Sequence, residues 1–332
     1  MKRFLHRFGR LLVLAIFLAA AWLLYERLKH YTLCQIGNAL SGIPWWHIAV
    51  AALLTVANYG ILVGYDWFAV RWVVGEKFPM RKISVAAFTG YAFSYNFGAT
   101  LFGTSIRYRL YSAWGVSLGQ ILELLVILGL TFWFGVFTLA GLVFVVSPLG
   151  IPPQVLDAFH EALRCHLPFD NTFWLGVVLL ALAAGYMMLS ILLRKPLRLF
   201  GWKLPIPPPK LTVYQIVIAC GDLLVAAAVM YWVLPPLAGG YIRILGVFML
   251  AFVAAVLSHV PGGYGVFESV FLFFFPEKTG PVVIAAIIVF RIIYYWIPLL
   301  IAAAMLGYHE LTLQSEPAQP PLAGRETTDE HR

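Results

Sequence analysis

The sequence has few charged residues for its length. Charged side chains make up 11% of its 332 residues, against about 25% in an ordinary soluble domain. Hydrophobic residues reach 61%, more than a soluble core of this size can bury. Apolar runs of about 18–25 residues, long enough to cross a bilayer, recur along the chain. Strand-length alternation of apolar and polar residues is missing, so helices are expected to form the spans. The sequence therefore predicts an all-α, polytopic membrane protein.

Cysteines and ligand-binding motifs are also scarce. The three cysteines, Cys34, Cys165 and Cys220, form no CxxC pair, so no structural zinc site is expected. The stretch DAFHEALRCH at 157–166 has the spacing HExxxxH instead of HExxH, and an amphipathic surface helix is the simpler interpretation. The sequence contains no GxxxxGK(S/T) motif for ATP. We expect neither a metal ion nor a cofactor.

The formal net charge of +8 comes from basic residues in short loops between the apolar runs. Such loops are typical of the cytoplasmic side of a membrane protein, where they face anionic lipids. Basic and aromatic residues do not interleave in the manner of a nucleic-acid-binding surface. We therefore expect membrane lipids as partners, and no nucleic acid.

The two ends of the chain differ in character. The basic stretch MKRFLHRFGR precedes an apolar run, Leu11–Tyr25, which continues past a cleavage-like box at Ala19–Ala21. This favours an uncleaved signal anchor over a cleaved signal peptide. The polar, proline-containing tail 311–332 is expected to be disordered, so 1–310 is the predicted membrane domain and no catalytic domain is expected after it. Further apolar segments lie at 45–70, 83–105, 119–146, 172–193, 212–234, 241–275 and 281–308.

The segment 83–105 is either one span or a hairpin that enters and leaves on the same side. With a cytoplasmic N-terminus and a hairpin, fifteen Lys and Arg residues lie inside and five lie outside. A full crossing would make the two sides nearly even, so the positive-inside rule favours the hairpin. Asn96 and Gly98 lie near its expected tip, where a turn needs such residues.

The segment 241–275 is too long for one straight span. Pro261 cannot continue a helical hydrogen-bond ladder, and Gly262, Gly263 and Gly265 allow a sharp reversal. Because lipid does not satisfy freed backbone groups, this break must face protein or a watery cavity. We therefore predict six full spans and two re-entrant hairpins, or eight spans if the hairpins are counted. Paired broken segments of this kind indicate a transport site between repeats.

Several ionisable or polar residues lie deep in the apolar segments. Asp222 and Asn58 are near the midpoints of 212–234 and 45–70, and Asp66 is nearer an end. Glu268 and Arg291 lie at depths of roughly 12 and 15 Å from one connecting loop, so on antiparallel helices they are expected to meet. One interpretation is a buried structural ion pair. The other, which we favour, is a pair that lines a substrate path.

Arg107 and Arg109 follow the first hairpin in RYRLY. They are interpreted either as ordinary charges at a cytoplasmic edge or as guanidinium groups that capture phosphate. Glu123 is a candidate to neutralise one of them. His259, beside the second break, is expected to bond a freed carbonyl.

These motifs resemble a known family. PGGYGVFE (261–268) and FRIIYYWIPLL (290–300) resemble the membrane domain of lysylphosphatidylglycerol synthases, and more closely the free-standing inner-membrane proteins of the YbhN type. The stretch around RYRLY matches that subgroup too, and the resemblance covers nearly all of 1–310. It implies a flippase-like membrane domain. In that family the break residues Pro261, Gly262, Gly263, Gly265, Glu268 and Arg291 correspond to the broken-helix motif, and Arg107 and Arg109 to the basic motif.

The expected function is movement of a phospholipid, or another polar-headed lipid, between leaflets of the bacterial inner membrane. We expect both termini in the cytoplasm, and a substrate path that passes Arg107, Arg109, Asn58, Asp222, Glu268 and Arg291. Transport is expected to be downhill, ion-coupled through a protonatable carboxylate, or driven by a partner. The chain is not expected to be an enzyme. The two alternatives left open are an intramembrane lipid-modifying enzyme and a membrane scaffold that does not transport.

Overall fold

The computed structural model describes residues 25, 29, 31–75, 77–98, 102–151, 170–192, 197–199, 202–204, 207–235, 240–275 and 279–315. Within these ranges the regular elements are helices, apart from one short ribbon and an isolated β-bridge between Gly150 and Asn171, so the all-α prediction is confirmed. The expected signal anchor at Leu11–Tyr25, the outer loop 157–166 with Cys165, and the tail 311–332 beyond Ser315 lie outside the described residues, apart from Tyr25. Residues 311–315, which were expected to belong to the disordered tail, instead continue the last helix.

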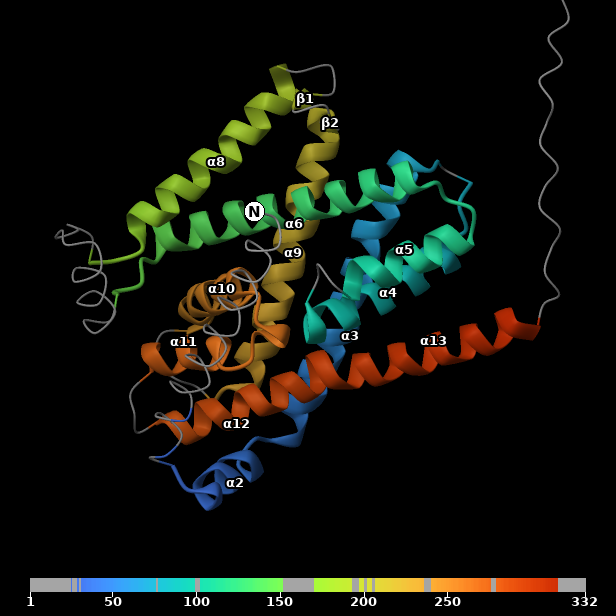
Figure 1. Cartoon of the computed structure of the whole chain (residues 1–332). Helices are drawn as coiled ribbons and strands as arrows, with labels where there is room; N and C mark the ends of the chain where they lie inside the picture. Colours follow the sequence, from blue (N-terminus) through green and yellow to red (C-terminus); the bar gives the residue numbers. More distant parts are fainter. Residues whose placement is uncertain are drawn as a thin grey trace, which may run out of the picture.

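The helices run in the following order (Figure 1). They are α2 (Leu33–Ser41), α3 (Trp45–Val73), α4 (Met80–Phe97), α5 (Thr104–Ala113), α6 (Leu118–Val146), α8 (Phe173–Leu192), α9 (Pro209–Val233), α10 (Gly240–Ser258), α11 (Val266–Phe274), α12 (Gly280–Arg291) and α13 (Ile297–Ser315). A π turn at Ile292–Trp296 joins α12 to α13 into one long element. The ribbon pairs β1 (Leu197–Leu199) with antiparallel β2 (Trp202–Leu204), between α8 and α9.

Six helical elements are long and apolar enough to cross a membrane: α3, α6, α8, α9, α10 and the joined α12–α13. The number agrees with the prediction, but the set differs. The sequence prediction counted Leu11–Tyr25 as a span and treated 241–275 as a hairpin, whereas α10 alone has 19 residues and qualifies by length. The partners α5 and α11, with 10 and 9 residues, are only about 15 Å long and cannot cross a core of about 30 Å.

One helix order occurs twice in the chain. A long helix is followed by a broken pair with a short second member, and then by another long element: α3, α4, α5, α6 and then α9, α10, α11, α12–α13. The packing repeats as well, because α3 contacts α4 as α9 contacts α10, and α5 contacts α6 as α11 contacts α12. The two first helices, α3 and α9, pack against each other. The pattern is a structural repeat that the sequence alone only suggested.

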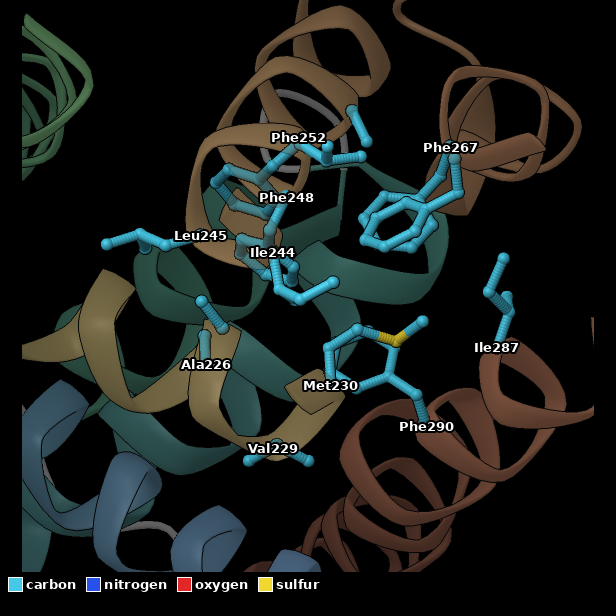
Figure 2. Packing of buried hydrophobic residues seen from close by; sticks show 14 of the residues in the cluster. Ala226, Val229, Met230, Ile244, Leu245, Phe248, Phe252, Phe267, Ile287 and Phe290 are labelled. Atoms are coloured by element: carbon cyan, nitrogen blue, oxygen red, sulfur yellow. The ribbon is translucent and has the colours of Figure 1, made fainter. Parts of the chain in front are cut away.

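Most of the second repeat is held by an aromatic core. Figure 2 shows side chains from α9, α10, α11 and α12 converging on one cluster. The rings of Phe248, Phe267 and Phe290 lie 5.7–6.0 Å apart, centroid to centroid, at its centre. Phe290 also stacks on Tyr294, at 5.2 Å. The core is therefore continuous with the polar residues of the π turn.

Candidate functional site

The second helix break lies where the glycines and the proline predict it. Helix α10 ends at Ser258, a single 3-10 turn covers Pro261–Gly263, and α11 begins at Val266. Gly262 and Gly265 have φ angles of 62° and 84°, in the left-handed region that favours glycine. A Cβ on Gly262 would also lie 2.5 Å from the ring of Tyr264, so a larger residue would force the turn apart.

Side chains at the start of the break replace the lost helical hydrogen bonds. The hydroxyl of Ser258 accepts a bond from the Val260 amide at 3.2 Å. The Nδ1 atom of His259 lies 2.9 Å from the carbonyl oxygen of Leu257, which is the role expected for this histidine. His259 itself has a φ of 55°, which is unusual for a residue with a side chain.

Glu268 and Arg291 form a buried ion pair that also hydrogen-bonds the backbone of the break. The Nε atom of Arg291 donates to Glu268 Oε1 at 2.6 Å, and its Nη1 donates to the carbonyl of Gly262 at 2.9 Å. The other carboxylate oxygen accepts from the Gly265 amide at 2.7 Å. The guanidinium also lies 4.1 Å from the ring of Tyr264. In this conformation, the pair therefore satisfies two backbone groups that the break frees, in addition to neutralising its own charges.

Arg107 is not at an open edge of the molecule. It is 4% exposed, and its Nε and Nη2 atoms donate to the two carboxylate oxygens of Asp66 at 3.0 and 2.9 Å. The hydroxyl of Tyr111 adds a third bond to Asp66, at 3.2 Å. Asp66, and not Glu123, is thus the residue that neutralises Arg107. The physical reason is the complete burial of Asp66 in α3, where a bidentate partner offsets the cost of desolvation. Arg109 lies exposed on the same short helix.

Asp222 and Asn58 meet at the contact between α9 and α3. The Nδ2 atom of Asn58 donates to Asp222 Oδ1 at 2.8 Å and to the Tyr294 hydroxyl at 2.5 Å. The Tyr65 hydroxyl donates to Asp222 Oδ2 at 3.0 Å. Both Asp222 and Asn58 are buried, at 3% and 0% exposed. Among the described residues, Asn58 Oδ1 has no hydrogen-bond partner.

Tyrosine rings connect the two ion pairs. The guanidinium of Arg107 lies 4.2 Å from the ring of Tyr91, and that of Arg291 lies 5.4 Å from the ring of Tyr295. Tyr95 bridges them, with its centroid 6.2 Å from Tyr91 and 5.7 Å from Tyr295. We call this group the tyrosine path; its members are Tyr59, Tyr65, Tyr91, Tyr95, Tyr294 and Tyr295. The network around Asp222 lies alongside it, through Tyr65 and Tyr294.

The two broken segments touch each other. Helix α4 ends at Phe97, next to Gly98 with a φ of 98°, and packs against the 3-10 turn of the second break. A Cβ on Gly262 would lie 3.1 Å from the carbonyl oxygen of Asn96. The Nδ2 atom of Asn96 donates to the carbonyl of Tyr295 at 3.1 Å. The tips of the two breaks therefore meet beside the tyrosine path.

An apolar cavity of about 640 Å³ opens between α6, α8 and α10. Every side chain that lines it is aliphatic, aromatic or a thioether, and one of them, Leu257, directly precedes the last residue of α10. The cavity therefore extends to the start of the second break. Its lining includes Trp133 and Phe137 of α6, Leu179 of α8, and Met249, Val253 and Leu257 of α10.

Sequence reasoning selected the charged residues but missed the tyrosines. Tyr91 and Tyr95 stand one helical turn apart in 83–105, and adjacent tyrosines occur at 294 and 295. Because a buried tyrosine hydroxyl needs a partner, this spacing was an available signal for a polar path. In the part of the chain that the structure describes, no three His, Cys, Asp or Glu side chains are grouped so that they would hold a metal ion.

Comparison with known proteins identifies the relatives of this chain. No family model matches it. It is 36% identical to the protein slr0712 of Synechocystis over 303 residues, which is 89% of each chain. It is 31% identical to the inner membrane protein YbhN of Escherichia coli over 254 residues, 75% of this chain and 76% of that protein. The chain belongs to the YbhN family.

A more distant relative extends the comparison. The chain is 23% identical over 301 residues to a phosphatidylglycerol lysyltransferase of Staphylococcus haemolyticus, covering 86% of this chain and 32% of that enzyme. The resemblance predicted from PGGYGVFE and its neighbours is thus confirmed. With six candidate spans and the relation to YbhN, the protein is a multi-pass protein of the inner membrane.

Proposed function

We propose that this protein moves a polar-headed lipid between the leaflets of the inner membrane. The observation that carries the proposal is the meeting of two helix breaks beside a buried polar path. Irregular backbone at membrane depth is tolerated only where it is buried in protein or lines a cavity, and paired breaks in repeated halves are typical of transport sites. The relation to a lysyltransferase that acts on phosphatidylglycerol favours a lipid over a soluble solute.

The proposal includes the orientation of the two broken pairs. Although α10 is by its length a candidate span, the α4–α5 and α10–α11 pairs are proposed to enter from opposite sides and to return to the side they entered, so that both are re-entrant. The short helices α5 and α11 support this, because neither can complete a crossing. Both termini then lie in the cytoplasm, in agreement with the excess of basic residues in the inner loops.

The headgroup and the acyl chains would follow different surfaces. The tyrosine path offers hydroxyl groups, and Arg109 is an exposed cation on α5, which suits an anionic headgroup. The apolar cavity between α6, α8 and α10 has no polar lining residue and suits an acyl chain. Its extension to the end of α10 would place that chain next to the second break.

The test is a leaflet-exchange assay with the purified full chain in liposomes. A fluorescent phosphatidylglycerol in the inner leaflet should reach the outer leaflet, where a membrane-impermeant quencher detects it, faster than in protein-free liposomes. Val253→Trp, which fills the apolar cavity from a partly buried position, should slow the exchange at least tenfold. Val217→Trp, the same change at a site that is 64% exposed, is the matched control and should not.

The outcomes separate the alternatives. Wild-type exchange no faster than in empty liposomes would refute the proposal. Equal exchange rates in the wild type and both tryptophan variants would refute the role of the cavity. Mass spectrometry of the same lipids detects chemical change of the headgroup. Turnover of the headgroup without exchange would instead support an intramembrane lipid-modifying enzyme.

A further inference from the structure

Three buried carboxylates lie in the described interior, and one of them differs from the other two. Asp66 is paired with Arg107, and Glu268 with Arg291. Among the residues that the structure describes, no Lys, Arg or His forms an ion pair with Asp222, although Asp222 is 3% exposed. A charged carboxylate without a cation costs several kcal/mol at membrane depth, so the site is suited to binding a cation.

The groups around Asp222 accommodate both a charged and a neutral carboxyl group. Two neutral donors, Asn58 Nδ2 and the Tyr65 hydroxyl, each bond one oxygen and favour the ionised form. Burial without a counter-ion favours the neutral form. Because no described cation pairs with Asp222, it can gain a proton without breaking a salt bridge.

Asn58 supplies the second observation. Its Oδ1 atom is buried and has no partner in the part of the chain that the structure describes, while its Nδ2 lies 2.8 Å from Asp222 and 2.5 Å from the Tyr294 hydroxyl. Half a rotation of the amide places Oδ1 where Nδ2 now lies. It would then accept one bond from a protonated Asp222 and one from the Tyr294 hydroxyl, while Nδ2 would take the position that now has no partner.

We propose that Asp222 is a proton-binding site, and that its protonation couples the lipid movement proposed above to the proton gradient. The coupling rests on the proposed function, whereas the binding of the proton does not. The proton enters from water on one side, binds a carboxylate oxygen, and leaves to water on the other side when the conformation changes. Tyr91 and Tyr95, which are only partly buried, connect the surface to this network.

A proton fits the site better than a sodium ion. Sodium requires several oxygen acceptors aimed at one point, but here both carboxylate oxygens already face donors. A proton needs only one free lone pair, and each carboxylate oxygen retains one.

Among the described residues, the other two buried carboxylates, Asp66 and Glu268, each form an ion pair with an arginine. Five members of the tyrosine path, on α3, α4 and the π turn, are titratable groups that interact electrostatically with Asp222: Tyr59, Tyr65, Tyr91, Tyr95 and Tyr294. On α12, Arg291 is bound to Glu268, and Asp66 on α3 is bound to Arg107 of α5. Three further helices, α6, α8 and α10, pack against α9. The Tyr186 hydroxyl of α8 bonds Gln215 of α9, which in turn bonds Thr131 of α6. The Tyr241 hydroxyl of α10 bonds the carbonyl of Leu224.

Infrared spectroscopy of the purified full chain in nanodiscs tests proton binding without any transport assay. As the pH is lowered, the wild type should gain the carbonyl band of a protonated carboxyl group that exchanges slowly with deuterium. Asp222→Asn should lack that band, and Asp222→Glu should keep it at a shifted pH. Asp170→Asn, the same change at an exposed aspartate, is the matched control and should keep it. Identical spectra for the wild type and Asp222→Asn would overturn the proposal.

Leaflet exchange under an imposed pH gradient tests the coupling. With one proton per lipid and no net charge moved, a gradient of one pH unit should produce about a tenfold lipid asymmetry in the wild type and none in Asp222→Asn. A sodium gradient at equal pH should have no effect. An asymmetry that persists in Asp222→Asn, or that follows sodium, would overturn the coupling. Exchange that ignores the pH gradient would overturn the coupling but leave the proposed function intact, whereas the infrared band without exchange would overturn the proposed function and leave proton binding intact.

Discussion

The ion pair between Glu268 and Arg291 allows the most quantitative prediction. Their side chains are 11% and 6% exposed, so either one left alone is a nearly buried charge. Glu268→Gln keeps the acceptor for the Gly265 amide but leaves Arg291 without its counter-charge. We expect a loss of about 3–5 kcal/mol in the free energy of unfolding. Arg291→Met should cost at least as much, because it also removes the donor to the carbonyl of Gly262.

The double variant should recover most of this loss. When both charges are removed, only the Gly262 carbonyl is left without its donor, a cost of about 1–3 kcal/mol. The two single effects and the double effect then give a coupling energy of at least about 3 kcal/mol. The measurement is the midpoint and slope of unfolding in a denaturing detergent, for the wild type, both single variants and the double variant. Glu123→Gln, the same change at an exposed glutamate, is the control and should stay within about 0.5 kcal/mol.

The same variants distinguish a structural pair from one that handles substrate. If the pair only stabilises the backbone of the break, the double variant should regain leaflet exchange together with stability. If the pair contacts the headgroup during transport, stability should return without exchange, and this is the outcome we expect. Single variants as stable as the wild type, or a double variant destabilised by the sum of the single effects, would refute the reasoning about burial.

Two further predictions concern packing and topology. Gly135→Ala should destabilise the protein by about 1–3 kcal/mol, because the new Cβ would lie 2.2 Å from that of Ala219 on α9. The control is Gly129→Ala on the same helix, whose new Cβ meets nothing within 4 Å and should be neutral or stabilising. Equal stabilities of the two variants in thermal unfolding would show that α6 and α9 do not approach this closely. In a cysteine-free background, Lys77→Cys and Ser112→Cys, both at exposed positions that flank the α4–α5 pair, should react with an impermeant thiol reagent from the same side of the membrane. Labelling from opposite sides would mean that the pair crosses the membrane.

Part of the candidate site could be predicted from the sequence. Asp222, Glu268 and Arg291 are conspicuous because ionisable residues are costly in apolar segments. The contact between Glu268 and Arg291 followed from their depths relative to one connecting loop. The partner of Arg107 did not, because Asp66 lies 41 residues away on a helix that no local spacing relates to α5. The hydrogen bond from Asn58 to Asp222 spans 164 residues, and it depends on which two long helices touch.

Composition and local pattern by themselves determined that this is a helical membrane protein, where most of its spans lie, and that a break occurs at Pro261–Gly265. These features follow from the cost of apolar surface in water and from the backbone limits of proline and glycine, which act over a few residues. Only the tertiary structure decided that the two breaks touch, that tyrosines connect the ion pairs, and that Asp222 has neutral donors and, among the described residues, no cation. Those features depend on the packing of α3 against α9 and of α4 against the second break. Contacts between helices far apart in the chain are set by the joint fit of many side chains, which no short stretch of sequence contains.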